Sequence, residues 1–297
     1  MTTIASTRAP RPSGSLARAA ARRRRRARRV ALNSAAGVFF LLWIFPVYWM
    51  VNTAFKPFGD ILKSTPGFLP VPLSLGNFTD ALGKPLFGDY LRNSLMMTGI
   101  AVVAGALLAL LAAVALTRFR FAGRRAFLIT ILIVQMIPQP ALVIPIFLSL
   151  KNANLLNTLP GLALTYAGFV LPFTIWTLRG FLHGVPVELE EAAMVDGAGR
   201  WRVIRSILLP LVAPGVIASS VFAFITAWND YLFAYVEMKD QDHYTLPVWL
   251  VSFSTSTGTD YGGLIAASTL FALPVVLFFL LIQRRLVEGM TSGAVKD

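Results

Sequence analysis

The chain contains no cysteine and few charged residues. It has 297 residues, of which 14% are charged and 56% are hydrophobic. The absence of cysteine excludes disulfide bonds, thiolate catalysis and cysteine-bound zinc. A soluble domain of this length carries about a quarter charged residues. Because the charges here cluster between long uncharged intervals, the composition indicates a polytopic membrane protein.

Histidine is also scarce, with only His183 and His243 in the chain. The sequence has no His-Glu-x-x-His helix, no Gly-x-Ser-x-Gly elbow and no phosphate-binding loop, since Gly83-Lys84 is followed by Pro85 and lacks the upstream glycine. We therefore expect no catalytic residue, no metal site and no cofactor in this chain. These absences argue against an enzyme.

Positive charge is concentrated before the first apolar segment. The net charge is +13, and arginine fills positions 22–26 and recurs at 28 and 29. A nucleic-acid-binding arm is the alternative for such a run, but its place directly before an apolar segment favours the positive-inside signal of a first span. We expect residues 1–29 to form a disordered basic cytoplasmic tail. The apolar stretch that follows is too long for the core of a cleavable signal peptide.

The apolar content of windows of about 20 residues predicts an all-α protein with six transmembrane helices. Helices are expected because backbone groups facing lipid have to be satisfied within their own segment. The membrane domain covers 30–287, and a short C-terminal tail covers 288–297. The expected spans are 31–53, 94–116, 127–149, 160–180, 208–229 and 264–283.

The charges between the spans predict their orientation. Basic clusters occur at the N-terminus, around 118–125, in the loop 183–210 and from Arg284 onward, whereas 230–263 is acidic. The basic bias alternates as an even number of spans requires, so we expect both termini to be cytoplasmic in a cell membrane.

The cytoplasmic loop 183–210 carries helix signals of its own. Pro186 suits a first helical turn, the acidic residues after it complement the helix dipole, and Gly197 can end the helix with a positive φ. Two short helices meeting at a glycine would form a knob for docking a soluble partner. The alternative is an amphipathic loop resting on lipid headgroups. The residues assigned to docking are Glu190, Glu191, Ala192, Ala193, Asp196, Gly197, Ile207 and Pro210.

This loop resembles the signature of bacterial ABC-importer permeases, in which Glu-Ala-Ala and a glycine precede Ile-x-Leu-Pro at a fixed distance. Here Glu191-Ala192-Ala193 and Gly197 precede Ile207-Leu208-Leu209-Pro210, with Ala198 to Ser206 between them. Nearly the whole chain resembles the smaller permease of maltose-type carbohydrate importers, in segments such as Asn93-Ser94-Leu95, Ala227-Trp228-Asn229-Asp230 and Gly289-Met290-Thr291-Ser292-Gly293.

The resemblance implies partners and roles. A second permease would complete the pathway, two subunits that bind ATP and magnesium would lie beneath the membrane, and an extracytoplasmic protein would deliver a sugar of two or more units. The loop would act as a coupling helix in which Glu191 contacts the ATPase, Gly197 makes the turn and Pro210 sets the angle of the next span. Membrane lipid is the remaining partner, and no nucleic acid is expected.

The spans contain few polar residues, which argues against a proton or ion relay. Gln135 and Gln139 flank Pro138, so we expect a broken helix that acts as a gate or one that is merely bent. Trp228, Asn229 and Asp230 could bind a sugar, by ring stacking and by hydroxyl contacts, or could belong to an interfacial aromatic belt.

Two other functions stay open. One is an importer of the same architecture for a glycerol phosphate, an amino acid or a peptide. No span interior carries the arginine or lysine that an organic phosphate calls for. The other is a self-sufficient channel or secondary carrier, against which stand the missing intramembrane charges and the missing internal repeats.

Overall fold

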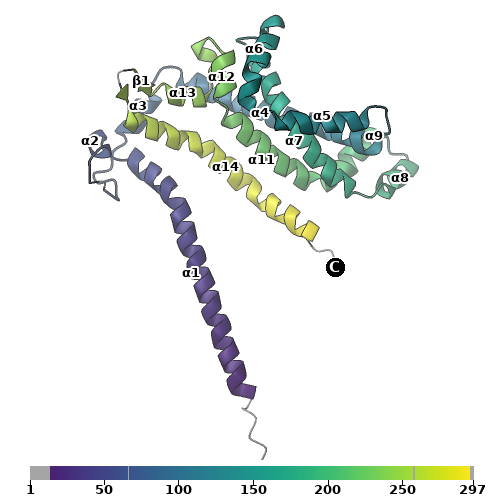
Figure 1. Ribbon diagram of the computed structural model, residues 1–297, viewed down its shortest axis with the longest axis horizontal. Coiled ribbons are helices and arrows are strands. Elements are labelled where there is room, and N and C mark those ends of the chain that lie inside the picture. The colour runs from purple at the N-terminus through teal and green to yellow at the C-terminus, as the bar shows by residue number, and fades with distance from the viewer. Residues whose placement is uncertain (1–13, 66, 257, 295–297) are drawn as a thin grey trace, which may run out of the picture.

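The computed structural model describes residues 14–65, 67–256 and 258–294, with side chains described from 22 to 283 outside the two gaps. Helices make up almost all of this part of the chain (Figure 1). The longer ones are α1 (Gly14–Ala54), α4 (Phe87–Arg118), α5 (Arg124–Met136), α6 (Val143–Asn152), α7 (Leu159–His183), α8 (Glu188–Val195), α11 (Ala213–Trp228) and α14 (Tyr261–Ala294).

Short elements join the longer helices. The strands β1 and β2 pair antiparallel, with Ser254 opposite Thr259. The short elements are α2 (Phe58–Ile61), α3 (Gly76–Leu82), η1 (Gln139–Leu142), α9 (Arg200–Val203), the π-helical turn η2 (Ile204–Leu208), α10 (Leu209–Leu211), α12 (Leu232–Glu237), η3 (Gln241–His243), α13 (Leu246–Val251), β1 (Ser254–Thr255) and β2 (Gly258–Thr259).

Four helices of the described part are long and apolar enough to cross a membrane, namely α1, α4, α7 and α14. The count rises to six if each of two bent helix pairs forms one span. The four long helices contain the predicted spans 31–53, 94–116, 160–180 and 264–283. The predicted all-α polytopic architecture is therefore confirmed, with six as the upper count of spans.

The predicted third span, 127–149, is not one helix. The segments 124–136 and 139–152 meet at an angle of 106°. Pro138 and Pro140 remove backbone donors at the break, and Ile137, which precedes the first of them, is extended with φ −75° and ψ 124°. The expected break at Pro138 is present, and it is a sharp turn that sends α5 and α6 in different directions (Figure 1).

The predicted fifth span, 208–229, is bent as well. The segment 200–211 meets α11 at 76°. Pro214 has no N–H and its ring opposes a helical conformation at the preceding residues, so the helix restarts at Ala213 instead of running on from Leu208. Of the predicted span 208–229, only α11 is the continuous apolar helix that the sequence predicted.

The basic N-terminal segment differs from the expectation of disorder. Residues 1–13 lie outside the described part, but α1 begins at Gly14 and includes the arginine run. Alanine and arginine are both good helix formers, so the apolar helix that follows can propagate backward through them. The predicted boundary at residue 29 therefore does not coincide with a change of structure.

The centre of the molecule is a close contact between α4 and α7, on which α11 packs. The face of α4 toward α7 consists of small residues four positions apart, which brings the two backbones close together. At Gly105 an added Cβ would lie 3.0 Å from Val170 Cγ1. On α7 larger residues repeat at the same interval and fill the space that this stripe leaves. The buried small residues are Ala101, Gly105, Ala109 and Ala113, and their counterparts are Leu162, Tyr166, Val170, Thr174, Leu178 and Leu182.

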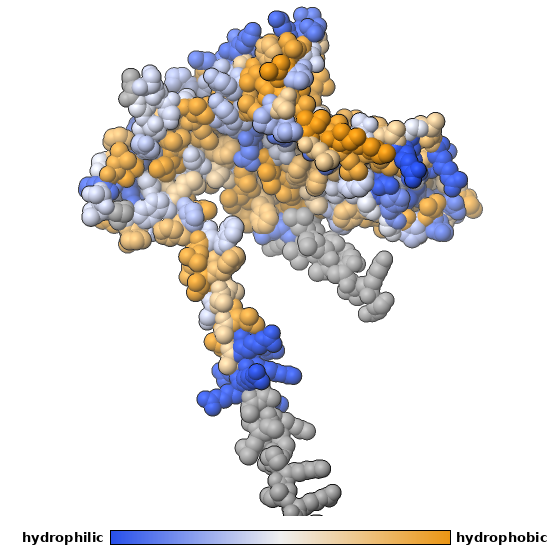
Figure 2. All heavy atoms as spheres, viewed as in Figure 1, coloured by the Kyte–Doolittle hydropathy of each residue, from blue (hydrophilic) through white to orange (hydrophobic). Residues whose placement is uncertain are grey.

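Polar residues gather at the two ends of this bundle. Around α8 and α9 the surface is hydrophilic, whereas α5 and the middle of α1 are apolar (Figure 2). At the opposite end Asn93 donates from Nδ2 to the carbonyls of Asp242 and Tyr244, at 2.7 and 3.0 Å. Ser94 Oγ accepts from the N–H of Leu246 at 2.8 Å. The Asn-Ser pair thus ties the acidic segment 230–263 to the first turns of α4.

The start of α7 depends on one glycine. Thr158 caps this helix by accepting from the N–H of Gly161 at 3.2 Å, and a Cβ on Gly161 would lie 2.1 Å from the carbonyl oxygen of Leu155. We predict that Gly161→Ala lowers the melting temperature of the purified protein, because a backbone atom must move. The matched change Gly168→Ala, in the same helix with nothing within 4 Å of the added Cβ, should leave that temperature unchanged or raise it. Equal melting temperatures for the two variants would contradict this packing.

Candidate functional site

The loop between α7 and α11 contains the residues that were predicted to dock a partner. The residues assigned to docking in and just after α8 differ in exposure. Glu190 is buried, whereas Glu191, Ala192, Asp196 and Gly197 are exposed. Ala193 is half-buried and packs against the core with Ala198. The structure therefore points Glu190 inward and leaves the Glu191 side of α8 free for a partner.

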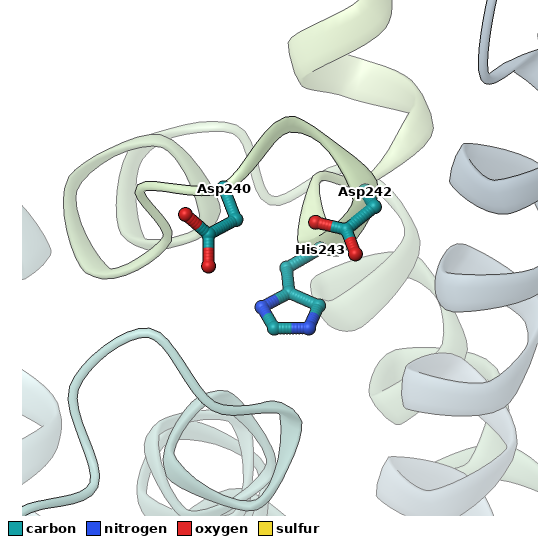
Figure 3. A group of neighbouring side chains, drawn as sticks. All are labelled: Asp240, Asp242 and His243. Atoms are coloured by element: carbon teal, nitrogen blue, oxygen red, sulfur yellow. The ribbon is translucent and has the colours of Figure 1, made fainter.

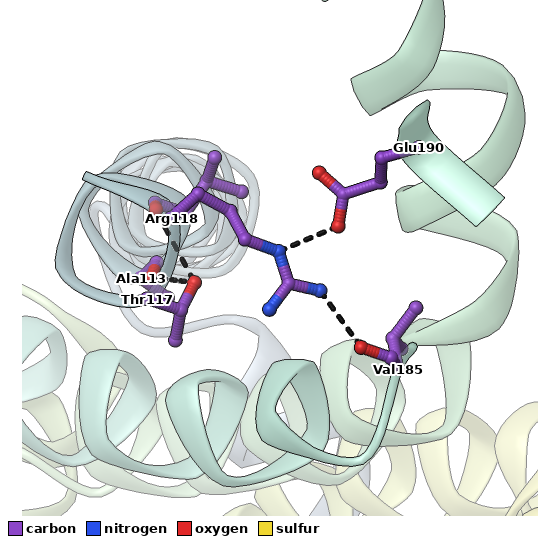
Figure 4. A network of polar contacts seen from close by, with 6 residues as sticks. Ala113, Thr117, Arg118, Val185 and Glu190 are labelled. Atoms are coloured by element: carbon purple, nitrogen blue, oxygen red, sulfur yellow. Dashed lines mark hydrogen bonds and ion pairs between the residues drawn. The ribbon is translucent and has the colours of Figure 1, made fainter. Parts of the chain in front are cut away.

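Glu190 pairs with an arginine from a distant helix (Figure 4). Arg118, in the last turn of α4, places Nε 2.5 Å from Glu190 Oε1 and donates from Nη2 to the carbonyl of Val185 at 3.0 Å. The two side chains are only 12% and 10% exposed. Sequence reasoning placed Arg118 among the cytoplasmic basic residues and missed this pair, because nothing local links positions so far apart in the chain.

Gly197 ends α8 with a Schellman motif. Its φ is +84°, its N–H donates to the carbonyl of Met194 at 3.1 Å, and the N–H of Ala198 donates to the carbonyl of Ala193 at 2.9 Å. These are the two bonds that define the motif, and they require the left-handed backbone that glycine adopts without strain. The predicted turn at Gly197 is therefore present, and its backbone holds α9 at a fixed angle to α8.

Apolar side chains are exposed on the same knob. Val195 on α8 is 87% exposed and Trp201 on α9 is 65% exposed. Beside them lies a hollow of about 470 Å³ between the end of α4 and the helices α8 and α9. It is lined by Arg118, Phe119, Arg120, Arg124, Glu190, Glu191, Met194 and Arg200, among others. An exposed tryptophan next to a charged hollow is a feature of binding surfaces.

The Ile-x-Leu-Pro part of the motif lies where the chain turns back toward the bundle. Ile207 is half-buried in the π-helical turn η2, and Pro210 is exposed in α10. Leu208 is buried in the core beneath the loop. A π-helical turn is a local widening of the helix that often accompanies functional sites. The change of direction itself falls two residues after Pro210, at Val212.

A second candidate region lies near the other end of the bundle. Gln139, Asn229 and Asp230, three of the residues predicted for the pathway, line one hollow of about 400 Å³ together with Tyr166, Phe169, Ile225, Thr226, Tyr231 and Leu232. A smaller hollow of about 220 Å³ contains Gln135 and shares Gln139 and Phe169 with the first. Gln135, Pro138 and Gln139 are exposed. The broken third segment therefore borders a polar and aromatic space.

Trp228 corrects the prediction of a sugar-stacking ring. Its side chain is fully buried, its Nε1 donates to the carbonyl of Phe271 at 3.2 Å, and its ring stacks on Phe224 and Phe271. The ring therefore joins α11 to α14 and has no face left for a ligand. The aromatic groups that do border the hollow are Tyr166, Phe169 and Tyr231.

Asp230 is largely occupied by contacts within the protein. Its carboxylate accepts from the hydroxyl of Tyr166 at 3.0 Å and from the N–H groups of Phe233 and Ala234 at 3.3 and 3.0 Å. It thereby caps the first turn of α12. Asn229 donates from Nδ2 to the carbonyl of Ile225 at 2.9 Å, and its side-chain oxygen is available to a hydroxyl in the hollow.

Glu237, at the end of α12, is a buried carboxylate that the sequence did not single out. It is 1% exposed, and its Oε1 accepts from the hydroxyl of Thr165 on α7 at 2.8 Å. Burial raises the pKa of Glu237 to about 7, while the Thr165 hydrogen bond opposes the rise. Burial of α12 against the bundle therefore costs less when this carboxyl is protonated, although its hydrogen bond to Thr165 favours the ionised form.

A small acidic group lies on the neighbouring surface (Figure 3). Asp240, Asp242 and His243 bring their ligand atoms within 4.8 Å of one another, and both carboxylates are exposed. Asp240 accepts from Nδ2 of Asn157 at 2.6 Å. Exposed carboxylates of this kind are ordinarily solvated, so the group contributes negative charge to the outer surface and supplies no argument for a metal.

These two regions, a helical knob at one end of a membrane bundle and a polar hollow toward the other, define a permease subunit. The chain belongs to the family of binding-protein-dependent transport system inner membrane components, which matches residues 101–292. This confirms the predicted class, a multi-pass permease of an ABC importer that is not itself the ATPase. A binding protein and an ATPase are therefore partners of the assembled transporter.

Relatives and solved structures agree with this family. The chain is 46% identical over 268 residues to the diacetylchitobiose uptake system permease DasC of Streptomyces coelicolor, covering 90% of this chain and 97% of that one. It is 32% identical to the trehalose/maltose transport system permease MalG of Thermococcus litoralis, over 91% and 97% of the two chains. A bacterial ABC transporter that imports alginate has the same fold, with a TM-score of 0.76 at 22% identity over 87% and 96% of the chains.

Glu237 gives a pH dependence to stability. Its folded pKa of about 7 lies above the usual 4.5, so its contribution is fully present below about pH 4.5 and is lost as the pH rises through 7. The difference between the two limits is on the order of 3 kcal/mol. We predict that Glu237→Gln melts at a higher temperature than the wild type at pH 8 and at a similar temperature at pH 5. Asp80→Asn, at an exposed carboxylate, is the control, and a Glu237→Gln profile parallel to the wild type would contradict the burial.

Proposed function

We propose that this permease imports a di- or oligosaccharide, with ATP hydrolysed by a separate subunit docked on the loop 183–210. The observation that carries the substrate class is the hollow beside the broken third segment. It combines tyrosine and phenylalanine rings with amide groups and holds no unpaired cationic side chain. Rings can cover the apolar faces of a sugar, and amides can bind its hydroxyls.

The relatives support the same substrate class. DasC and NgcG of Streptomyces coelicolor are named for diacetylchitobiose, SugB of Mycobacterium tuberculosis for trehalose, and MalG of Thermococcus litoralis for trehalose and maltose. All of these sugars are uncharged. An organic phosphate would call for arginine or lysine beside the hollow, and its lining contains neither.

The exposed face of α8 supports the assignment of the loop to the ATPase. Glu191, Ala192 and Asp196 face away from the bundle, and Val195 and Trp201 add apolar contact area. We assign docking to Glu191, Ala192, Asp196 and Gly197, and support of the docking surface to Glu190, Ala193, Ile207 and Pro210. We assign both termini and this loop to the cytoplasm, and the basic clusters that they carry support this orientation.

The isolated position of α1 supports a second permease subunit. This helix leaves the bundle and extends away from it (Figure 1), and its most apolar window is 0% buried within the chain. Its C-terminal part contacts α14, and the apolar side chains between Val30 and Tyr48 are all exposed. We assign this surface to lipid and to the partner permease, with which α1 would complete the pathway.

Uptake tests the substrate. The complete transporter, reconstituted in liposomes with its binding protein, should accumulate labelled diacetylchitobiose when ATP is present, and trehalose or maltose is the second sugar to try. Asn229→Leu should slow uptake about fivefold, because one hydrogen bond to a hydroxyl is lost. Gln283→Leu, at the opposite end of the bundle, is the matched control. Uptake of glycerol phosphate or an amino acid, and not of any sugar, would refute the substrate class.

Gly197 tests the docking role of the loop. Gly197 and Gly199 both have nothing within 4 Å of an added Cβ, and they differ in that Gly197 has φ +84° and Gly199 has φ −69°. We predict that Gly197→Val costs about 1–2 kcal/mol of backbone strain and changes the angle between α8 and α9. Solute moved per ATP hydrolysed should fall, whereas Gly199→Val should keep the wild-type ratio. A wild-type amount of solute moved per ATP in both variants would refute the docking role of the loop.

A further inference from the structure

The pair between Arg118 and Glu190 is unlike the other ion pairs in the described part of the chain. Lys63–Asp60 and Arg92–Asp89 each join residues three positions apart and lie on the surface. Arg118–Glu190 joins α4 to α8, and its side chains are 12% and 10% exposed. Surface pairs of the first kind contribute little, whereas separating a buried pair leaves an uncompensated charge in an apolar place.

The arginine makes its contacts in two directions. Nε meets Glu190 on α8, and Nη2 meets the carbonyl of Val185, where α7 has just ended. The planar guanidinium can hold both acceptors at fixed angles, which a lysine ammonium does not do in the same way. Figure 4 shows the side chain reaching from the end of α4 to both partners. One residue therefore fixes the end of α4 to the start of the docking loop.

The other end of the loop is connected to the spans in a different way. From α9 the chain passes through the π-helical turn η2 and then bends by 76° before α11. No ion pair joins α9, η2 or α10 to the spans among the described residues. In the part of the chain that the structure describes, this end of the loop is attached to the spans by apolar packing of Val203 and Leu208 and by the bend, without a polar tie like that of Arg118.

We propose that Arg118 is a positioning residue for transport, which makes α4 move together with α8 when the ATPase closes. This inference rests on the proposed docking of an ATPase on the loop. The Arg118–Glu190 pair would pass the displacement of α8 to α4, which packs along α7 and α11. The bend before α11 would let that helix follow later.

The test separates coupling from folding. Arg118→Gln alone leaves Glu190 buried without its partner, so the double variant R118Q/E190Q is the informative one, because it removes both charges and leaves an amide pair. In the reconstituted transporter we expect solute moved per ATP hydrolysed to fall about tenfold, with ATP hydrolysis retained. Arg92→Gln, on the same helix in a surface pair, should keep the wild-type ratio. A wild-type ratio in R118Q/E190Q would overturn the proposal.

A second measurement does not depend on the substrate. Because the chain has no cysteine, spin labels can be placed solely at Leu111→Cys on α4 and Leu189→Cys on α8, both at exposed positions. With the pair intact, the distance between the labels should be the same with and without ATP. In R118Q/E190Q the distance should change between the two states, and Arg118→Lys supplies the comparison should the double variant not assemble.

The outcomes of the two measurements are distinct. An ATP-dependent distance in the protein with the intact pair, or an unchanged distance in the variants, would overturn the proposal. A transporter that ignores every sugar but shows the expected distances would refute the substrate class and support the role of Arg118. Failure of the chain to bind any ATPase subunit would refute the proposed docking, and with it the basis of this inference.

Discussion

Every polar group of this chain that enters the hydrocarbon layer has to find its partner inside the protein, because lipid offers none. Long helices satisfy their own backbones, which is why α4 and α7 run unbroken through most of the bundle. Breaks occur at prolines, after Ile137 and before Pro214, and they border a polar hollow or the docking loop. The charged side chains of α4 and α7 lie near the ends of these helices by the same rule.

Burial of apolar surface does little to hold such helices to one another, since lipid is as apolar as leucine. Close packing therefore holds the helices together, and the stripe of small residues on α4 allows it. At the ends, where water is near, specific polar contacts take over. Asn93 and Ser94 hold the acidic segment at one end, and Arg118 holds the docking loop at the other. One helix is thus tied to the segments at both ends of the bundle.

Apolar windows and local sequence signals predicted most of the fold. Apolar windows located the four long helices, and Gly197 was identified as the end of α8 because a positive φ is a local requirement. The small-residue stripe was visible too, at intervals of four in α4, although it was not used. By contrast, the bend before α11 was missed because Pro214 was treated as part of a continuous span.

Long-range contacts account for the errors at the candidate sites. Nothing near Trp228 in the sequence distinguishes a ring that faces a ligand from one that stacks on Phe271 in another helix. Glu190 and Glu191 are adjacent and chemically identical, and only the approach of Arg118 from α4 assigns them different roles. The arginine-rich segment was expected to be disordered from its composition, but it continues a helix that the neighbouring apolar residues stabilise.

The single glycine within the stripe on α4 has a mechanical consequence. Val170 of α7 fits against Gly105, so closely that a Cβ there would lie 3.0 Å from Val170 Cγ1, and α4 cannot slide along α7 without losing this fit. It can rock about that point. Gly105 lies about 20 Å from Arg118 and about 18 Å from Asn93 at ~1.5 Å per residue. A rigid helix that pivots at such a midpoint would move its two ends by similar amounts in opposite directions.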